Sequence, residues 1–376
     1  MWNAEVASEE SKAGLAPVHR VIDRHAPYKR IATEEAWNIP EILEAQVRLL
    51  AGAGAPDDPS LRMAGMFAKM ARLQEQLMDV GEKRIARMDA LGIDKQLLLL
   101  TSPGVQVLEP DEGTALARLA NDRLAEICRR HPNRFAGLTV FAPQDVQGAV
   151  SEIERGMKTL GLNGAVINSH FRGRYLDEAP YRPILEALEA YDAALYIHPT
   201  IPPKTWSQPY EFRGFGGALA GFSHEVWMHT MGLIMSGAFD RFPKLRVVIG
   251  HMGEGMPLLL YRFDWMQSNA DGKPGLRGGA PAVTLRHKIS YYFKRNIWIT
   301  TSGQGWEPSV KFCMDVLGPD RVIYAMDYPY QQSADEVAAY DAFDLRPEHK
   351  KMLMQTNAEQ VFRLASSRPP PCPPAR

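Results

Sequence analysis

Residues 195–199, Leu-Tyr-Ile-His-Pro, show the pattern that decides the fold: a short run of bulky apolar residues that ends in a polar side chain. The same pattern recurs in Val247-Val-Ile-Gly-His251 and in Val322-Ile-Tyr-Ala-Met-Asp327. Glu34 follows a fourth run of this kind near the start of the chain. Such apolar runs, rich in β-branched residues, are typical of strands that are buried on both faces of a parallel sheet.

Eight runs of this type are expected to be strands. They end near Thr33, Thr101, Phe141, Ile167, Ile197, Gly250, Thr301 and Met326. Helical periodicity follows most of them, over residues 115–130, 146–160, 181–191, 226–239 and 309–317, and a C-terminal helical segment is expected over 347–362. This alternation predicts an α/β fold, and eight strands favour a (β/α)8 TIM barrel over an open, doubly wound sheet. No Gly-x-Gly-x-x-Gly turn follows an early strand, as a dinucleotide-binding sheet would require.

One barrel domain is expected over residues 28–364, between a polar N-terminal extension, 1–27, and a Pro-rich tail, 365–376. Two connections are longer than a minimal barrel needs. The first is a helical insertion after strand one, from Asn38 to about Ile93, and the second is the proline-, glycine- and aromatic-rich loop 201–221. Both leave the C-terminal ends of strands, so both are expected to lie over the site end of the barrel.

The composition excludes several classes of protein. With 376 residues, 45% of them apolar and 23% charged, and a net charge of −1, the chain resembles an ordinary globular protein without the basic excess that binds nucleic acid or anionic membranes. No signal peptide and no membrane span is recognisable, so a cytoplasmic location is expected. Cys128, Cys313 and Cys372 form no close pair, which argues against a disulfide framework and a thiolate metal site.

Four polar residues follow predicted strands one, five, six and eight: Glu34, His198, His251 and Asp327. Each alone has an ordinary explanation, as a solvated carboxylate, a hydrogen-bonded histidine or a turn residue. Together they are expected to converge, because the carboxyl ends of the strands meet at one end of a barrel. Imidazole and carboxylate groups suit a divalent ion such as Zn²⁺, Mn²⁺, Fe²⁺ or Mg²⁺, so the pattern favours a metal site.

The segments around these residues resemble one enzyme family. They are Ala32-Thr-Glu-Glu-Ala36, Tyr196-Ile-His-Pro199, Gly250-His-Met-Gly-Glu254 and Met326-Asp-Tyr-Pro-Tyr330. They are similar to the amidohydrolase-superfamily branch that contains aminocarboxymuconate-semialdehyde decarboxylase and the non-oxidative aromatic acid decarboxylases, and most of all to the 5-carboxyvanillate decarboxylases. The likeness extends over about residues 30–364. It implies a carboxy-lyase that removes CO2 from an ortho-hydroxy aromatic acid, in the catabolism of aromatic compounds such as those derived from lignin.

The resemblance also implies roles at the site. Glu34, His198 and Asp327 take the ligand positions of one divalent ion, which is Mn²⁺ in most such enzymes and Zn²⁺ or Mg²⁺ in relatives. Asp327 is the expected proton donor to the ring carbon. His251, oriented by Glu254, is expected to contact the substrate or relay the proton. Burial would raise the pKa of the Asp327 carboxyl and a bound cation would lower it, so the sequence leaves the sign of its pKa shift open.

Substrate contacts are expected from four further residues. Arg262, Tyr330 and Phe222 match pocket positions of the family. Lys69 stands where relatives place an arginine, and because a lysine makes no planar bidentate contact, the choice of substrate is expected to differ.

Strand one departs from the family pattern at Ala36, where many relatives have a histidine ligand. Glu34 is then the only ligand expected from strand one, and more of the coordination sphere is left to water or substrate. No lysine lies near Asn168 to form a bridging carbamate, so a binuclear site is disfavoured.

Two other functions use the same features. A metal-dependent hydrolase of a lactone or an amide would need almost the same ligands, since the ion can also activate water. A non-catalytic barrel that binds a ligand has no need of four convergent polar residues. The expected partner is a small aromatic carboxylate, with no nucleic acid and no membrane, and family likeness implies a homodimer or homotetramer.

Overall fold

A ring of short parallel strands lies at the centre of the protein. The computed structural model describes residues 21–52, 57–270 and 284–364. Its strands are β1 (Ile31–Trp37), β2 (Lys95–Leu100), β3 (Phe135–Gly137), β4 (Thr139–Val140), β5 (Ala165–Ile167), β6 (Leu195–Ile197), β7 (Val247–Ile249), β8 (Ile297–Thr300) and β9 (Val322–Ile323). All paired strands are parallel, in the orders β1-β2-β3 and β4-β5-β6-β7-β8-β9. Only Leu138 separates β3 from β4, so these two form one interrupted strand, and the eight-stranded barrel is confirmed.

The strands are apolar because each is covered on both faces. In β7, Val247, Val248 and Ile249 are fully buried and pair in register with residues 195–197 of β6 and 297–299 of β8. One face of each strand fills the barrel interior while the other packs beneath helices, so nearly every position must be apolar. Polar side chains are then expected mainly where strands end.

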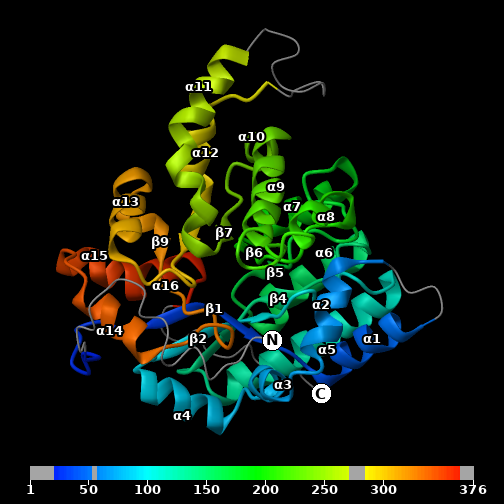
Figure 1. The fold of residues 1–376 in the computed structure, drawn as a ribbon, viewed down its shortest axis with the longest axis horizontal. Coiled ribbons are helices and arrows are strands. Elements are labelled where there is room, and N and C mark those ends of the chain that lie inside the picture. The colour runs from blue at the N-terminus through cyan, green and yellow to red at the C-terminus, as the bar shows by residue number, and fades with distance from the viewer. Residues whose placement is uncertain (1–20, 53–56, 271–283, 365–376) are drawn as a thin grey trace.

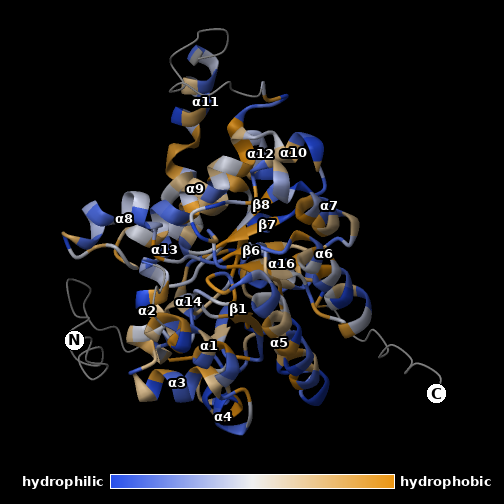
Figure 2. Cartoon of the chain, turned by 90° about the vertical axis from the view of Figure 1, so that its right-hand side faces the viewer, coloured by the Kyte–Doolittle hydropathy of each residue, from blue (hydrophilic) through white to orange (hydrophobic). Residues whose placement is uncertain are grey.

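Helices surround this barrel (Figure 1). They are α1 (Pro40–Ala51), α2 (Pro59–Phe67), α3 (Ala71–Met78), α4 (Glu82–Leu91), α5 (Pro110–Arg130), α6 (Val146–Arg155), α7 (Arg182–Ala190), α8 (Lys204–Glu211), α9 (Gly221–Met235), α10 (Ala238–Arg241), α11 (Leu260–Ala270), α12 (Ile289–Asn296), α13 (Glu307–Leu317), α14 (Ala334–Ala342), α15 (Pro347–Lys351) and α16 (Asn357–Val361). Short 3-10 or π-helical turns are η2 (Gly156–Leu160), η3 (Ala179–Tyr181), η4 (His251–Leu259), η5 (Pro319–Arg321) and η6 (Met352–Thr356). Figure 2 shows hydrophobic residues concentrated in the central strands and hydrophilic residues on outer faces of helices such as α3 and α4. None of the described helices combines the length and apolar character needed to cross a bilayer.

The predicted helical segments coincide with helices, including the C-terminal one, which the structure divides into α15, η6 and α16. The helical insertion after strand one is also present, as α1 to α4. The interpretation of residues 201–221 as a loop is wrong in part, because α8 occupies its first half with Pro209 inside the helix. A proline lacks the backbone N–H of a helix interior, so the sequence argued against a helix there.

The two long connections contact each other. Ser60 of α2 donates a hydrogen bond from Oγ to the carbonyl oxygen of Ile201 (3.1 Å). Ser60 Oγ also accepts one from Thr200 Oγ1 (2.9 Å), and Thr200 accepts another from Ser102 (2.8 Å). These bonds tie the insertion to the chain that leaves β6, three residues after His198.

The pairing of β1 with β2 has one irregularity, between Ala32 and Glu35. An extra residue in one strand of a pair bends that strand and turns its side chains. The prediction that strand one ends near Thr33 is therefore wrong, since the strand continues to Trp37. Glu34 lies within β1, at the irregular position, rather than after its end.

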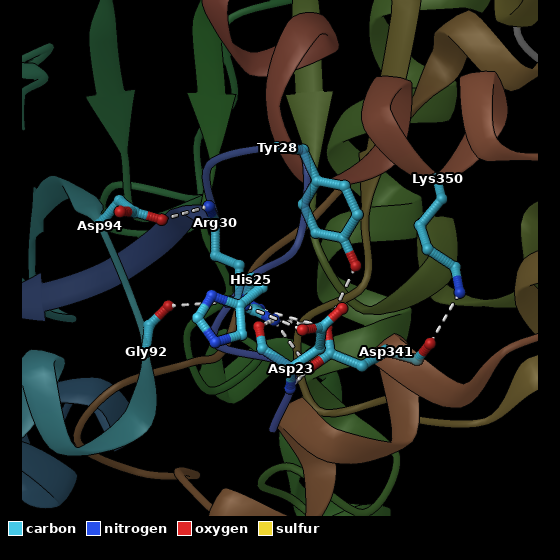
Figure 3. A network of polar contacts seen from close by, with 8 residues as sticks. All are labelled: Asp23, His25, Tyr28, Arg30, Gly92, Asp94, Asp341 and Lys350. Atoms are coloured by element: carbon cyan, nitrogen blue, oxygen red, sulfur yellow. Dashed lines mark hydrogen bonds and ion pairs between the residues drawn. The ribbon is translucent and has the colours of Figure 1, made fainter. Parts of the chain in front are cut away.

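A buried polar network fixes the start of β1 to the C-terminal helices (Figure 3). Arg30 and Asp341 of α14 form a salt bridge of 2.7 Å, and each side chain is 5% exposed. Asp341 also accepts from the Tyr28 hydroxyl (3.1 Å) and from the Asp23 backbone N–H (2.8 Å), and the Lys350 ammonium donates to its carbonyl oxygen (2.7 Å). Residues 23–28 thus pack on the barrel, whereas residues 1–20 and the tail 365–376 lie outside the described residues.

Candidate metal centre

Three of the predicted ligands come together at one end of the barrel. Atoms of Glu34, His198 and Asp327 that could bind a cation all lie within 4.8 Å of one another. Glu34 belongs to β1, His198 follows β6 directly, and Asp327 lies four residues beyond β9. Convergence of parallel strand ends accounts for this grouping of residues that are up to 293 positions apart, from 34 to 327.

The two oxygens of Glu34 are in different environments. Oε2 accepts hydrogen bonds from the Tyr196 hydroxyl and from Thr300 Oγ1 (2.8 Å). Oε1 is buried and has no hydrogen-bond partner among the described residues. A buried carboxylate oxygen without a partner is costly unless a cation neutralises it, so the arrangement fits a metal ligand.

Gly250 makes room for this carboxylate. A Cβ at this position would lie 2.7 Å from each oxygen of Glu34, closer than atoms can pack. The glycine between β7 and His251 therefore allows the backbone of the sixth barrel strand to pass beside the site.

His198 is held as a neutral imidazole. Burial lowers its pKa to about 4, although the charge of Glu34 opposes this effect. Its Nδ1 lies 2.9 Å from Oδ1 of Asn168, which leaves Nε2 as the nitrogen available to a metal.

His251 and Glu254 lie on a left-handed turn. Residues 251–255 all have φ between 50° and 75°, a conformation that costs roughly 1–2 kcal/mol for each residue other than glycine. The turn brings His251 Nδ1 within 2.9 Å of Glu254 Oε1. Trp227 of α9 stabilises it by donating from Nε1 to the Glu254 carbonyl oxygen (2.7 Å).

His251 also faces Asp327, with 3.6 Å between Nε2 and Oδ2. Burial by itself would lower the pKa of His251, but the Glu254 and Glu34 carboxylates and the nearby Asp327 carboxylate raise it well above its ordinary value. Burial raises the pKa of Asp327 to about 6, against the opposing effect of His251. In the protein alone, the two groups are thus suited to share one proton.

The residues that are expected to contact the substrate differ in burial and in their location in the fold. Tyr330 is half-buried, forms a hydrogen bond with Thr101 and packs against Phe67 with 5.9 Å between ring centroids. Lys69 is exposed on the turn after α2, two residues beyond Phe67. Phe222 is half-buried at the start of α9, and Arg262 is exposed on α11.

Several residues that shape the site were not predicted. Tyr196 lies in β6, two positions before His198. Because alternate residues of a strand share a face, this spacing could have identified Tyr196 as a residue that faces the site. Asn168 directly follows the apolar run of β5, which is the same signal that identified the ligands. Thr300 and Trp227 are recognisable only once the strands and α9 are placed in space.

The sequence of this chain is similar to those of known enzymes. The Amidohydrolase family model matches residues 74–364. Gamma-resorcylate decarboxylase of Rhodococcus jostii is 30% identical over 346 residues, which cover 89% of this chain and 98% of that enzyme.

Solved structures give the same result. A mutant of 5-carboxyvanillate decarboxylase from Novosphingobium aromaticivorans, with bound manganese and 3-methoxy-4-hydroxy-5-nitrobenzoic acid, is 43% identical, with a TM-score of 0.86 and coverage of 92% of this chain and 99% of that one. The 2,6-dihydroxybenzoate decarboxylase from Rhizobium is 30% identical, with a TM-score of 0.76 and coverage of 90% and 99%. The chain therefore belongs to the amidohydrolase family.

Proposed function

We propose that this protein is a metal-dependent carboxy-lyase that removes CO2, without oxidation, from an ortho-hydroxy aromatic acid similar to 5-carboxyvanillate. The observation that carries the proposal is the cluster of buried Glu34 and His198 with half-buried Asp327, which lies beside His251. It occurs in a chain 43% identical to a 5-carboxyvanillate decarboxylase that was solved with manganese. A role in the breakdown of lignin-derived aromatic compounds is a prediction from this activity, and a cytoplasmic location is proposed as well.

Glu34, His198 and Asp327 would hold the ion, for which Mn²⁺ is proposed and Zn²⁺ or Mg²⁺ are alternatives. When bound, the ion supplies Lewis-acid stabilisation of negative charge on the substrate. Oxygen and imidazole ligands suit all three ions, so the choice of Mn²⁺ rests on the relatives.

The protein groups of the site can deliver a proton. Decarboxylation requires a proton to add to the ring carbon that bears the carboxylate, after which the C–C bond breaks, its electrons return to the ring and CO2 leaves. Asp327, whose pKa burial raises to about 6 in the protein without an ion, is the proposed donor. His251 lies close enough to return a proton to Asp327 or to bind the phenolic oxygen, and Glu254 fixes the orientation of its ring.

Tyr330, Phe222, Lys69 and Arg262 are proposed to contact the aromatic ring and the second carboxylate. Tyr330 is supported by its position three residues after Asp327 and by its packing on Phe67. Lys69 would reach the pocket from the adjacent turn as a point charge, which selects a carboxylate less strictly than an arginine does.

The exposed apolar residues of α11 support a homodimer, or a homotetramer built from dimers. Tyr261 is 83% and Trp265 54% exposed on this helix, and α11 extends away from the barrel together with α12 (Figure 1). Exposed aromatic residues gathered on one element often mark an interface between subunits. Light scattering coupled to gel filtration measures the assembly, and a monomer at micromolar concentration would contradict it.

The proposed function is tested by metal analysis followed by a product screen. Protein treated with chelator and reloaded with Mn²⁺ is incubated with 5-carboxyvanillate, γ-resorcylate, 2,3-dihydroxybenzoate and salicylate, and CO2 release is measured. We expect CO2 from at least the first acid, stoichiometric Mn²⁺ in the wild type and little in Glu34→Gln. Hydrolysis of a lactone or amide panel without CO2 release from any of these acids would support the hydrolase alternative.

A further inference from the structure

Asn168 connects the metal centre to the neighbouring strand. It directly follows β5 and is 3% exposed, and its Oδ1 lies 2.9 Å from Nδ1 of His198. Its amide nitrogen points the other way, toward the carbonyl oxygens of Leu100 (3.3 Å) and Thr101 (3.4 Å) at the end of β2. The oxygen of the Asn168 amide therefore contacts the residue that follows β6, and its nitrogen contacts the end of β2.

The surroundings decide which way the Asn168 amide faces. Carbonyl oxygens only accept hydrogen bonds, so the NH2 group must face Leu100 and Thr101. The oxygen of the amide is then directed at His198, where it can only accept. Nδ1 of His198 must therefore carry the hydrogen, and Nε2 must be the nitrogen with a free lone pair.

Gln106 holds Asn168 in this position. Gln106 Oε1 accepts from the Asn168 backbone N–H (2.6 Å), and Gln106 Nε2 donates to the carbonyl oxygens of Asn168 (3.2 Å) and His170 (2.8 Å). The Gln106 side chain is itself buried. Two of these three hydrogen bonds hold the backbone N–H and carbonyl groups of Asn168, so its backbone has little freedom to turn the side-chain amide away from His198.

We propose that Asn168 is a positioning residue that fixes His198 in the tautomer with hydrogen on Nδ1 and thereby sets the affinity of the metal site. The inference rests on the proposed metal site but not on decarboxylation. A neutral imidazole has two tautomers, and only one of them presents Nε2 as a ligand. Groups that fix the other ring nitrogen of a metal-binding histidine typically account for about 10- to 100-fold in metal affinity.

Three variants separate this role from a structural one. Asn168→Leu keeps the branched shape of the side chain but removes the acceptor that faces His198, together with the NH2 donor to Leu100 and Thr101. Asn168→Asp keeps the oxygen that accepts from His198, so the His198 tautomer should be retained. The second carboxylate oxygen would face the carbonyl oxygens of Leu100 and Thr101, so the variant should be less stable than the wild type. Asn121→Leu is the matched control, because Asn121 is also a buried amide that joins neighbouring segments, through Val140 and Glu152, but does not touch the site.

The test measures ¹⁵N chemical shifts of His198 in metal-free protein, together with Mn²⁺ titrations. We expect Asn168→Leu to populate the tautomer with hydrogen on Nε2 and to bind Mn²⁺ about 10- to 100-fold more weakly. Asn168→Asp and Asn121→Leu should keep hydrogen on Nδ1 and bind at least as tightly as the wild type.

An unchanged tautomer and unchanged affinity in Asn168→Leu would overturn the proposal. If Asn168→Leu does not fold, the test relies on Asn168→Asp. Loss of the tautomer with hydrogen on Nδ1 in this variant would also overturn the proposal. The tautomer is measured without metal or substrate, so a protein that binds Mn²⁺ but releases no CO2 would refute the proposed function and leave this inference standing.

Discussion

The two oxygens of Glu34 show how single atoms define this site. Oε2 is satisfied by Tyr196 and Thr300, and Oε1 is left without a hydrogen-bond partner among the described residues. A carboxylate that only needed to be buried stably would be bonded at both oxygens. The asymmetry orients Glu34 and leaves one oxygen for a cation, as His198 is oriented at one nitrogen and free at the other.

At the residue scale, Asp327→Asn tests the proposed proton donor. The amide has nearly the same shape but no acidic proton, so turnover of the Mn²⁺-loaded enzyme should fall at least about 10²- to 10⁴-fold while the fold is kept. Asp320→Asn, a change at a half-buried residue of η5 that lies away from the cluster, should retain full activity. CO2 release by a folded, metal-loaded Asp327→Asn at near wild-type rate would remove Asp327 from this role.

Sequence reasoning identified the residues that strand order alone brings together. Glu34, His198 and Asp327 each follow or lie within an apolar run, and parallel strands place such positions at one end of the barrel. Their supporting partners were missed, because a polar residue in a strand such as Thr300 looks the same whether it faces a helix or a ligand. Which partner it meets depends on the tertiary arrangement.

At the element scale, the left-handed turn 251–255 must be held against its own strain. Trp227→Phe keeps the aromatic ring but removes the hydrogen bond to Glu254, leaving a carbonyl oxygen less well satisfied at a cost of about 1–3 kcal/mol. Displacement of the turn should lower kcat about 10-fold with a smaller change in KM.

Trp298→Phe is the matched control for the turn. Its Nε1 also donates to a backbone carbonyl oxygen, that of Asp320 (3.1 Å), but away from the site. We expect a similar loss of stability with kcat preserved. Equal kcat values in the two tryptophan variants, measured by steady-state CO2 release, would show that the turn does not depend on Trp227.

The network around Asp341 makes a prediction about stability rather than activity. In Asp341→Ala the Arg30 guanidinium would remain buried without its carboxylate, which typically costs about 3–5 kcal/mol. Chemical denaturation measures this loss. Glu112→Ala is the control, because Glu112 pairs with Arg48 in an exposed salt bridge that is worth less than about 1 kcal/mol. Equal losses in the two variants would contradict the structural role of the network.

The ends of strands were predictable where the sequence changes abruptly from apolar to polar residues. The strands that end at Ile167 and Ile197 were located to the residue, since each apolar run stops at a polar residue. The end of β1 was misplaced because Glu34 and Glu35 are polar residues inside a strand. Glu35 is accommodated there by bonds from Gln96 (3.1 Å) and from the Met326 backbone N–H (3.0 Å), which no local pattern shows.

At the scale of the whole molecule, stability should depend on pH through Glu225 of α9. This buried carboxyl accepts hydrogen bonds from Ser169 (3.0 Å) and Tyr175 (3.1 Å), and burial, the largest effect, raises its pKa from 4.5 to about 8. A raised pKa in the folded state means that the protonated form is favoured by folding. The stability that this group contributes is complete below about pH 4.5 and is lost as the pH rises through about 8.

Glu225→Gln stays neutral, so it should remove this dependence. The free energy of unfolding is measured for both proteins by denaturant titration at pH 5.5 and pH 8.5. The value for Glu225→Gln minus that for the wild type should be roughly 3 kcal/mol larger at pH 8.5 than at pH 5.5. Glu186→Gln, at an exposed position of α7, should show no such difference. A constant difference between Glu225→Gln and the wild type at both pH values would contradict the prediction.

The central claim is that the assembled barrel protonates an aromatic ring carbon and releases CO2. The most direct test is to incubate the Mn²⁺-loaded protein with 5-carboxyvanillate in D2O and to analyse the product by NMR and mass spectrometry. We predict vanillate with one deuterium at the ring carbon that carried the lost carboxylate, and one CO2 for each vanillate. Recovery of unchanged 5-carboxyvanillate from a metal-loaded, folded protein would contradict the claim for this substrate, and failure with all four aromatic acids would contradict it altogether.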